Sequence, residues 1–186
     1  MPERDAKLDE STVAPGSAVP ESQSTLLQLV GFRLGGEEYC LNILQVQEII
    51  RMQGLTHVPN APESIEGVIN LRGKVIPVFG LRKRFGTPPQ SQSKDARIVI
   101  VDLKDEVLGF EVDSVTEVLR IPAEAVVPAP RLSVRNNEYI SGVGKLGGRL
   151  LLLLDLNRLM DDVERREIAN LSGPAAPSAA QEVLAK

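Results

Sequence analysis

The chain has 186 residues, of which 42% are hydrophobic, 25% are charged and 3% are aromatic. This length holds one ordinary domain or two small ones, and without Trp the core must be built from Val, Leu and Ile. The net charge of −4 argues against nucleic acid or an anionic membrane as the main partner, because both attract basic surfaces. The single Cys excludes an internal disulfide and a multi-cysteine metal site, and suggests a reducing compartment.

Both ends of the chain differ in composition from its middle. Residues 1–24 are rich in Ser, Pro, Ala and charge, which predicts a disordered N-terminal arm, and residues 166–186 predict a flexible C-terminal tail. No apolar run approaches the roughly 18 residues of a membrane-spanning helix, and the N-terminus lacks the apolar region of a signal peptide. We therefore expect a soluble intracellular protein with one ordered region, residues 25–165.

The first half of this region consists of short apolar segments separated by turn residues, as is typical of β-strands. We expect strands or strand pairs at residues 27–34, 39–43 and 67–78, and a short turn or helix at residues 81–85. Within 67–78, Gly73 stands where the chain must reverse, since glycine reaches positive φ without steric cost. Residues 44–51 stay ambiguous, because their apolar spacing fits a helical turn while their β-branched content favours a strand.

A polar, proline-containing stretch at residues 86–95 predicts a linker or a long surface loop, and the strand pattern restarts after it. Strands are expected at residues 97–103, 107–112, 115–119 and 142–156. The spacing of Leu159, Met160, Val163 and Ile168 then predicts a short C-terminal helix.

The second half repeats the first at fixed offsets. Glu117 follows Glu48 by 69 residues, and Gly142 follows Gly67 by 75, so six residues are inserted within 131–139. The two copies span roughly 28–85 and 97–160, with about five short strands each. A unit of this size buries little surface alone, so the copies should pack together. Short strands with Gly and Pro turns suggest small closed barrels, which leave no exposed sheet edge.

No catalytic motif in the sequence is strong. Gly142–Gly147 matches a dinucleotide-binding glycine pattern but leads into a strand instead of a helix. His57 is the only histidine, and Cys40 lies in an apolar strand, where a buried structural thiol is the better interpretation. No carboxylate spacing points to acid–base chemistry, and Arg82-Lys83-Arg84 is interpreted as a solvated face. We expect no catalytic residue, no cofactor and no metal.

Two charged residues stand out from apolar surroundings. Glu48 interrupts an apolar stretch, and Arg72 lies near the tip of the 67–78 hairpin. They are either ordinary surface charges or a pair across a groove, at the edge of an apolar patch made by Val46 and Ile49. An apolar patch with a charged rim is typical of a protein-binding surface.

Many residues at fixed spacings closely resemble the CheW family, adaptors that couple bacterial chemoreceptors to the histidine kinase CheA. The likeness spans about residues 25–165. In the first half it rests on Glu38-Tyr39, Asn42-Ile43-Leu44, Val46-Gln47-Glu48-Ile49, Gly67-Val68, Asn70-Leu71-Arg72-Gly73, Pro77-Val78, Leu81-Arg82 and Phe85. In the second half it rests on Gly109, Val112-Asp113, Val115, Val118-Leu119, Pro128-Ala129-Pro130 and Glu138-Tyr139-Ile140-Ser141-Gly142.

The resemblance implies a mainly all-β fold of two five-stranded SH3-like barrels in a pseudo-twofold arrangement, with a short C-terminal helix. Whether the two barrels exchange strands stays open, so a boundary between them near residue 90 is not fixed. The implied function is scaffolding without catalysis, in the cytoplasm, at membrane-associated receptor arrays. The implied partners are the tip of the chemoreceptor's cytoplasmic hairpin and the CheW-like regulatory domain of CheA. The protein is expected to be a monomer alone, without direct membrane insertion.

Carried over position by position, the resemblance implies receptor contact or groove support for Val46, Glu48, Ile49, Leu55, Gly67, Arg72, Val115 and Val118. Kinase-contacting residues are not assigned. One position departs from the family pattern, which commonly has Asp where this chain has Gly80, while the second copy keeps Asp155. This departure puts the local turn geometry in doubt more than the function.

Three alternatives stay open at this stage. The first is a CheW-type adaptor of a related pathway for surface motility, development or second-messenger output. The second is a small-barrel enzyme, which a turnover-linked pocket containing His57 and several carboxylates would favour. The third is a fragment of CheA itself, against which the initiating Met and the two arms argue.

Overall fold

A computed structural model describes residues 25–89, 93–103, 106–129, 138–160, 164–166 and 168. The predicted arms lie almost entirely outside these residues, as do parts of the predicted linker and of the insertion. Within the described part, the strands are β1 Leu26–Leu34, β2 Glu37–Asn42, β3 Val46–Arg51, β4 Ile65–Leu71, β5 Lys74–Gly80, β6 Arg97–Leu103, β7 Glu106–Val112, β8 Ser114–Pro122, β9 Val126–Pro128, β10 Ile140–Leu146 and β11 Arg149–Leu154. The helical turns are α1 Leu81–Arg84, α2 Leu156–Leu159 and two 3₁₀ turns, Ile43–Gln45 and Ala123–Ala125.

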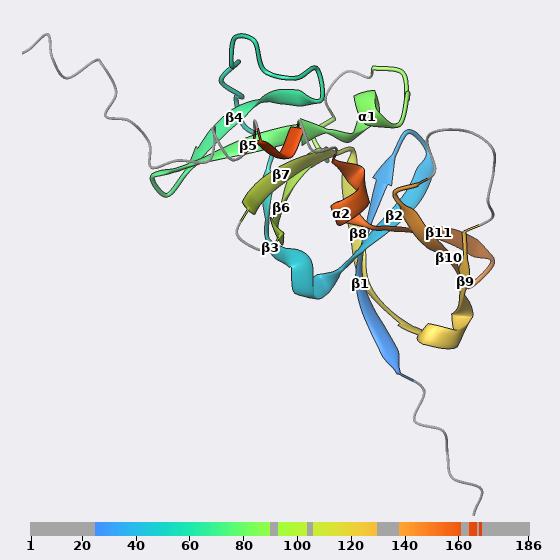
Figure 1. Ribbon diagram of the computed structural model, residues 1–186. Helices are drawn as coiled ribbons and strands as arrows, with labels where there is room; N and C mark the ends of the chain where they lie inside the picture. The colour runs from blue at the N-terminus through green and yellow to red at the C-terminus, as the bar shows by residue number, and fades with distance from the viewer. Residues whose placement is uncertain are drawn as a thin grey trace, which may run out of the picture.

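The strands form two sheets, which confirms the predicted mainly all-β class with two subdomains (Figure 1). Sheet A has the order β8-β1-β2-β11-β10-β9, and sheet B has the order β3-β6-β7-β5-β4. The sixth strand of sheet A is β9, whose counterpart in the first copy is a single bridge between Thr56 and Val68. The ambiguous segment 44–51 becomes a 3₁₀ turn followed by β3.

Each sheet combines strands from both sequence copies. Sheet A joins β1 and β2 to β8–β11, and sheet B joins β6 and β7 to β3–β5. The joints are parallel pairs, with Cys40 opposite Leu153 in one and Gly109 opposite Val78 in the other. Gly109 follows Cys40 by 69 residues, and Leu153 follows Val78 by 75, so the sequence offsets carry one joint onto the other. Each copy thus donates its first hairpin to the sheet of the other copy.

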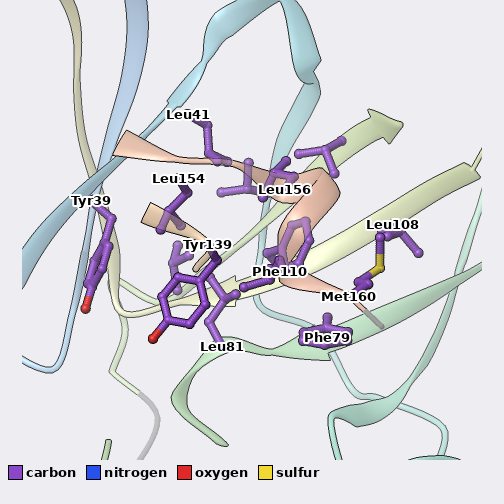
Figure 2. Close-up of a cluster of buried hydrophobic side chains, with 14 of the residues drawn as sticks. Tyr39, Leu41, Phe79, Leu81, Leu108, Phe110, Tyr139, Leu154, Leu156 and Met160 are labelled. Atoms are coloured by element: carbon purple, nitrogen blue, oxygen red, sulfur yellow. The ribbon is translucent and has the colours of Figure 1, made fainter. Parts of the chain in front are cut away.

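A central core lies between the two sheets and belongs to both. Figure 2 shows Leu41 and Leu154 of sheet A with Phe79 and Phe110 of sheet B, whose rings meet edge to face at 5.8 Å. Smaller clusters fill each sheet separately. Burying apolar area in one shared cluster stabilises both sheets at once, which two small units could not achieve apart.

The segment after β11 returns to the first half of the chain. Met160 packs into the central core, and the fully buried Ile168 packs there too, beyond residue 165 where the predicted domain ends. Buried Glu164 accepts a hydrogen bond from Ser64 Oγ at 2.6 Å and lies 3.5 Å from the guanidinium of Arg84. Apolar packing therefore attaches this segment to the central core, and the carboxylate of Glu164 attaches it to residues around β4 and α1.

Glu66 accounts for the departure at Gly80. An ideal Cβ built on Gly80 would lie 2.2 Å from Oε1 of Glu66, so the Glu66 side chain fills the space that a side chain at position 80 would need. In the second copy, Asp155 caps α2 by accepting a hydrogen bond from Asn157 N–H at 3.0 Å. In the first copy the carboxylate comes instead from β4, where Glu66 pairs with Lys83 at 2.9 Å.

Gly80→Asp should therefore destabilise the fold by about 1–2 kcal/mol, since the new side chain meets that of Glu66. Glu66→Ser in the same chain should recover most of this loss, giving a coupling of about 1 kcal/mol in a double-mutant cycle of urea unfolding. Additive effects of the two substitutions would contradict this account.

Candidate functional site

Arg72 holds a backbone conformation that a side chain normally avoids. It occupies the two-residue turn between β4 and β5 with φ +53°, followed by Gly73 at +83°. Asn70 Oδ1 accepts a hydrogen bond from Gly73 N–H at 2.9 Å and supports the turn. The counterpart of Arg72 in the second copy is Gly147, at φ +55°. The turn forms without an arginine, so the strain of about 1 kcal/mol at Arg72 points to a role for its side chain.

The side chain of Arg72 forms the expected ion pair with Glu48. The guanidinium donates Nη1 to Oε1 at 3.0 Å and Nη2 to Oε2 at 3.1 Å, the two-pronged geometry that arginine makes with carboxylates. Arg72 is 79% exposed and Glu48 27%. The pair links β3 to the β4–β5 turn, at opposite ends of the strand order, so sheet B curls round on itself. That this pair borders a binding groove stays a prediction.

Two of the predicted site residues are exposed and apolar, one in each sheet. A bulge at Gln47 interrupts the register of β3, after which Ile50 packs into sheet B while Ile49 points outward and is 40% exposed. On β8, Val118 is 56% exposed. Ile49 directly follows Glu48 in the chain, and an exposed β-branched side chain next to a charged pair fits a protein-binding surface.

Four of the predicted site residues are partly or wholly internal. Val46 and Val115 are half-buried, and both pack against the central core. Leu55 packs against the core of sheet B, and Gly67 allows close backbone approach, since a Cβ there would lie 2.7 Å from the carbonyl of Thr56. These four residues are therefore wholly or partly internal, while Glu48, Arg72, Ile49 and Val118 have side chains that are at least partly exposed.

The structure contains a second charged cluster that the sequence interpretation did not single out. Arg149 donates Nη2 to Glu117 Oε1 at 2.8 Å, and its Nη1 lies 3.4 Å from Glu38 Oε1. The hydrogen bond to Glu117 and the charge of Glu38 raise the pKa of Arg149, which stays a cation. The signal that could have found this cluster is the offset of 69, which maps Glu48 onto Glu117.

The interpretation of Arg82-Lys83-Arg84 as a solvated face was wrong. Arg82 binds Asp113 with N–O distances of 3.0 and 2.5 Å, Lys83 binds Glu66, and Arg84 approaches Glu164. Asp113 also accepts from Gly35 N–H at 2.9 Å. This run therefore ties α1 to three other parts of the chain.

His57 lines an open pocket of about 410 Å³ together with Glu63, Glu66 and Lys83. This is the combination that the enzyme alternative called for. Glu66, however, is engaged by Lys83, and no carboxylate hydrogen-bonds His57 in the described part of the chain. Among the described residues, no group of three or more His, Cys, Asp or Glu side chains could hold a metal ion.

Cys40 is fully buried, and its Sγ donates to the carbonyl of Leu152 at 3.7 Å. Burial, with the nearby charge of Glu38, raises the pKa of its thiol to about 12. The thiol therefore stays protonated near neutral pH, which supports the structural interpretation of Cys40. In the described residues, no helix has the length and hydropathy needed to cross a bilayer.

Three comparisons place the chain among known proteins. Residues 28–164 match the CheW-like domain family. The chain is 37% identical over 147 residues to chemotaxis protein CheW of Helicobacter pylori, covering 79% of this chain and 89% of that protein. Chemotaxis protein CheW of Klebsiella aerogenes is 37% identical over 142 residues, with 76% and 86% covered. The crystal structure of scaffolding protein TtCheW from Thermoanaerobacter tengcongensis matches with a TM-score of 0.70 and 36% identity, covering 75% of this chain and 96% of that chain.

The strain at Arg72 predicts a difference between two substitutions that both delete the ion pair. Arg72→Gly should be about 1 kcal/mol more stable than Arg72→Ala, because glycine relieves the positive φ and alanine does not. Urea unfolding of the two variants measures the difference. Equal stabilities, or a more stable alanine variant, would mean that the turn carries no strain.

The raised pKa values predict a loss of stability at alkaline pH. The unfolded thiol of Cys40 ionises near pH 9.0 and the folded one near 12, so its contribution is complete below 9 and lost as the pH rises towards 12. Tyr39, raised by burial from 10.0 to about 12, acts in the same direction. Unfolding midpoints at about pH 8 and about pH 10 should differ less in Cys40→Ala than in the parent chain. An equal difference in both proteins would mean that the Cys40 thiol does not contribute to the loss of stability at alkaline pH.

Proposed function

This chain belongs to the CheW-like domain family, and from that premise we propose that it couples chemoreceptors to the histidine kinase CheA by binding both. Its general role is that of a chemotaxis adaptor. The finer proposal concerns the partners: the tip of the receptor's cytoplasmic hairpin on one side, and the CheW-like regulatory domain of the kinase on the other.

The observation that carries the receptor site is the Glu48–Arg72 pair on a strained turn. Two of the five N–H donors of Arg72 bind Glu48, and the exposed guanidinium has others to offer to a partner. An exposed ion pair stabilises a fold by only about 0–1 kcal/mol, less than or similar to the strain at Arg72. Binding energy is therefore the better explanation for keeping arginine at this position.

In this proposal the receptor contacts the outer side of β3 and β8. Ile49 and Val118 supply exposed apolar area, and Glu48 and Arg72 supply the charged rim. Val46, Val115, Leu55 and Gly67 hold these strands and the β4–β5 hairpin in place from inside. The kinase domain docks elsewhere on the two sheets.

The proposed mechanism is coupling by binding, without group transfer. An adaptor transmits a signal only through contacts that differ between the active and inactive arrangements of its partners. The affinity of each individual contact can be modest when many copies assemble into an array, since multivalency raises the overall affinity. We propose that this assembly takes place in the cytoplasm, beneath membrane-bound receptors.

The test is a titration of the purified protein against a receptor hairpin and against the kinase regulatory domain. Glu48→Lys and Arg72→Ala should each weaken receptor binding by about tenfold or more, because a rim charge is reversed or lost. Kinase binding should not change. Glu124→Lys is the matched control, since it reverses an exposed charge on the Ala123–Ala125 turn. Unchanged receptor affinity in folded variants would refute the placement of the site.

A further inference from the structure

Sheet A repeats the arrangement around Glu48 almost residue for residue. Val46, Glu48 and Ile49 on β3 correspond at an offset of 69 to Val115, Glu117 and Val118 on β8. The first valine of each set packs against the same central core, and the last residue is exposed. Both strands therefore start against the central core, which forms the junction between the two sheets, and they carry the same sequence of features in sheet B and in sheet A.

Each carboxylate is paired with an arginine from the facing hairpin, but from different positions in it. Arg72 lies in the β4–β5 turn, where its counterpart in the β10–β11 turn is Gly147. In sheet A the guanidinium comes instead from Arg149, two residues later, with its Nη2 2.8 Å from Glu117. Two different backbone positions thus bring a guanidinium to equivalent carboxylates.

Arg149 lies 3.4 Å from the buried carboxylate of Glu38, but its closer partner Glu117 is too exposed for this pair to serve mainly the fold. The side chains of Arg149 and Glu117 are 44% and 51% exposed, and ion pairs in that setting add little stability. The residues next to them in the chain, Leu150 and Val118, are exposed large apolar side chains. Charges and apolar groups together at the surface are what a protein partner needs.

We propose that Glu117 and Arg149 form a second charged anchor for the same helical hairpin, on the other side of the junction from Glu48 and Arg72. This inference rests on the proposed receptor-binding function. It is also continuous with the proposed site, because Glu117 directly precedes Val118 on β8.

The partner that fits two such anchors is an antiparallel pair of helices. Its two helices are related by an approximate twofold axis, as are the two sheets, so each helix meets one carboxylate–guanidinium pair and one exposed β-branched residue. The donors of Arg72 and Arg149 call for hydrogen-bond acceptors on the partner, namely Glu, Asp, Gln or Asn side chains at one point on each helix.

The experiment measures the affinity of the full chain for a receptor cytoplasmic hairpin and, separately, for the kinase regulatory domain. Glu117→Lys should weaken hairpin binding by about fivefold or more and leave kinase binding unchanged, as expected for a reversed rim charge. Glu117→Gln, which can still accept from Arg149, should have a smaller effect in the same direction. Glu124→Lys is the matched control, because it reverses an exposed charge beyond the far end of β8. Thermal melting of each variant checks the fold.

The outcomes separate this inference from the function on which it rests. If Glu48→Lys weakens hairpin binding and a folded Glu117→Lys does not, the second anchor is refuted and the proposed function stands. If neither substitution weakens hairpin binding, the proposed receptor site is refuted together with the second anchor. If the unsubstituted chain does not bind the hairpin at all, the proposed function itself fails. If Glu117→Lys weakens only kinase binding, the surface belongs to the kinase and the inference is overturned.

Discussion

The rest of the structure depends on the exchange of hairpins between the two sequence copies. The parallel joints β2–β11 and β5–β7 complete each sheet with strands from the other copy, and one apolar core fills the space between them. Separating the copies would break both sheets and expose that core, so the sheets are held in a fixed relation. This relation sets the spacing between Val46 and Val115, and with it the geometry of any surface that spans both sheets.

The two sheets and their shared core hold the exposed charges with little loss of stability. Glu48 and Arg72 meet at the outer edge of sheet B, and the arginine occupies a turn that glycine forms in the second copy. The shared core provides the stability that permits such local strain. An adaptor needs both a stable core and exposed charges, because its contacts must be available to partners while its shape stays constant as the partners change state.

The internal repeat was the feature of the fold that could be predicted most clearly from the sequence. The offsets of 69 and 75 correctly related the two parallel joints, and the lone charge of Glu48 correctly led to Arg72. Other side-chain partners, which depend on how neighbouring elements pack, could not be found in this way. Glu66 filling the space at Gly80, and Lys83 pairing with it, depend on how β4 and α1 meet, about which periodicity says nothing. Nor does a local pattern reveal that Ile168 returns to the central core.

The most direct test of the account is methyl NMR of the full chain, titrated with a receptor cytoplasmic hairpin. The account predicts that the largest shift changes fall on the exposed methyls of Ile49 and Val118, on β3 and β8, while buried methyls such as those of Leu151 and Ile121 change little. Changes confined to one sheet, or centred away from these two strands, would contradict a binding surface that spans the junction.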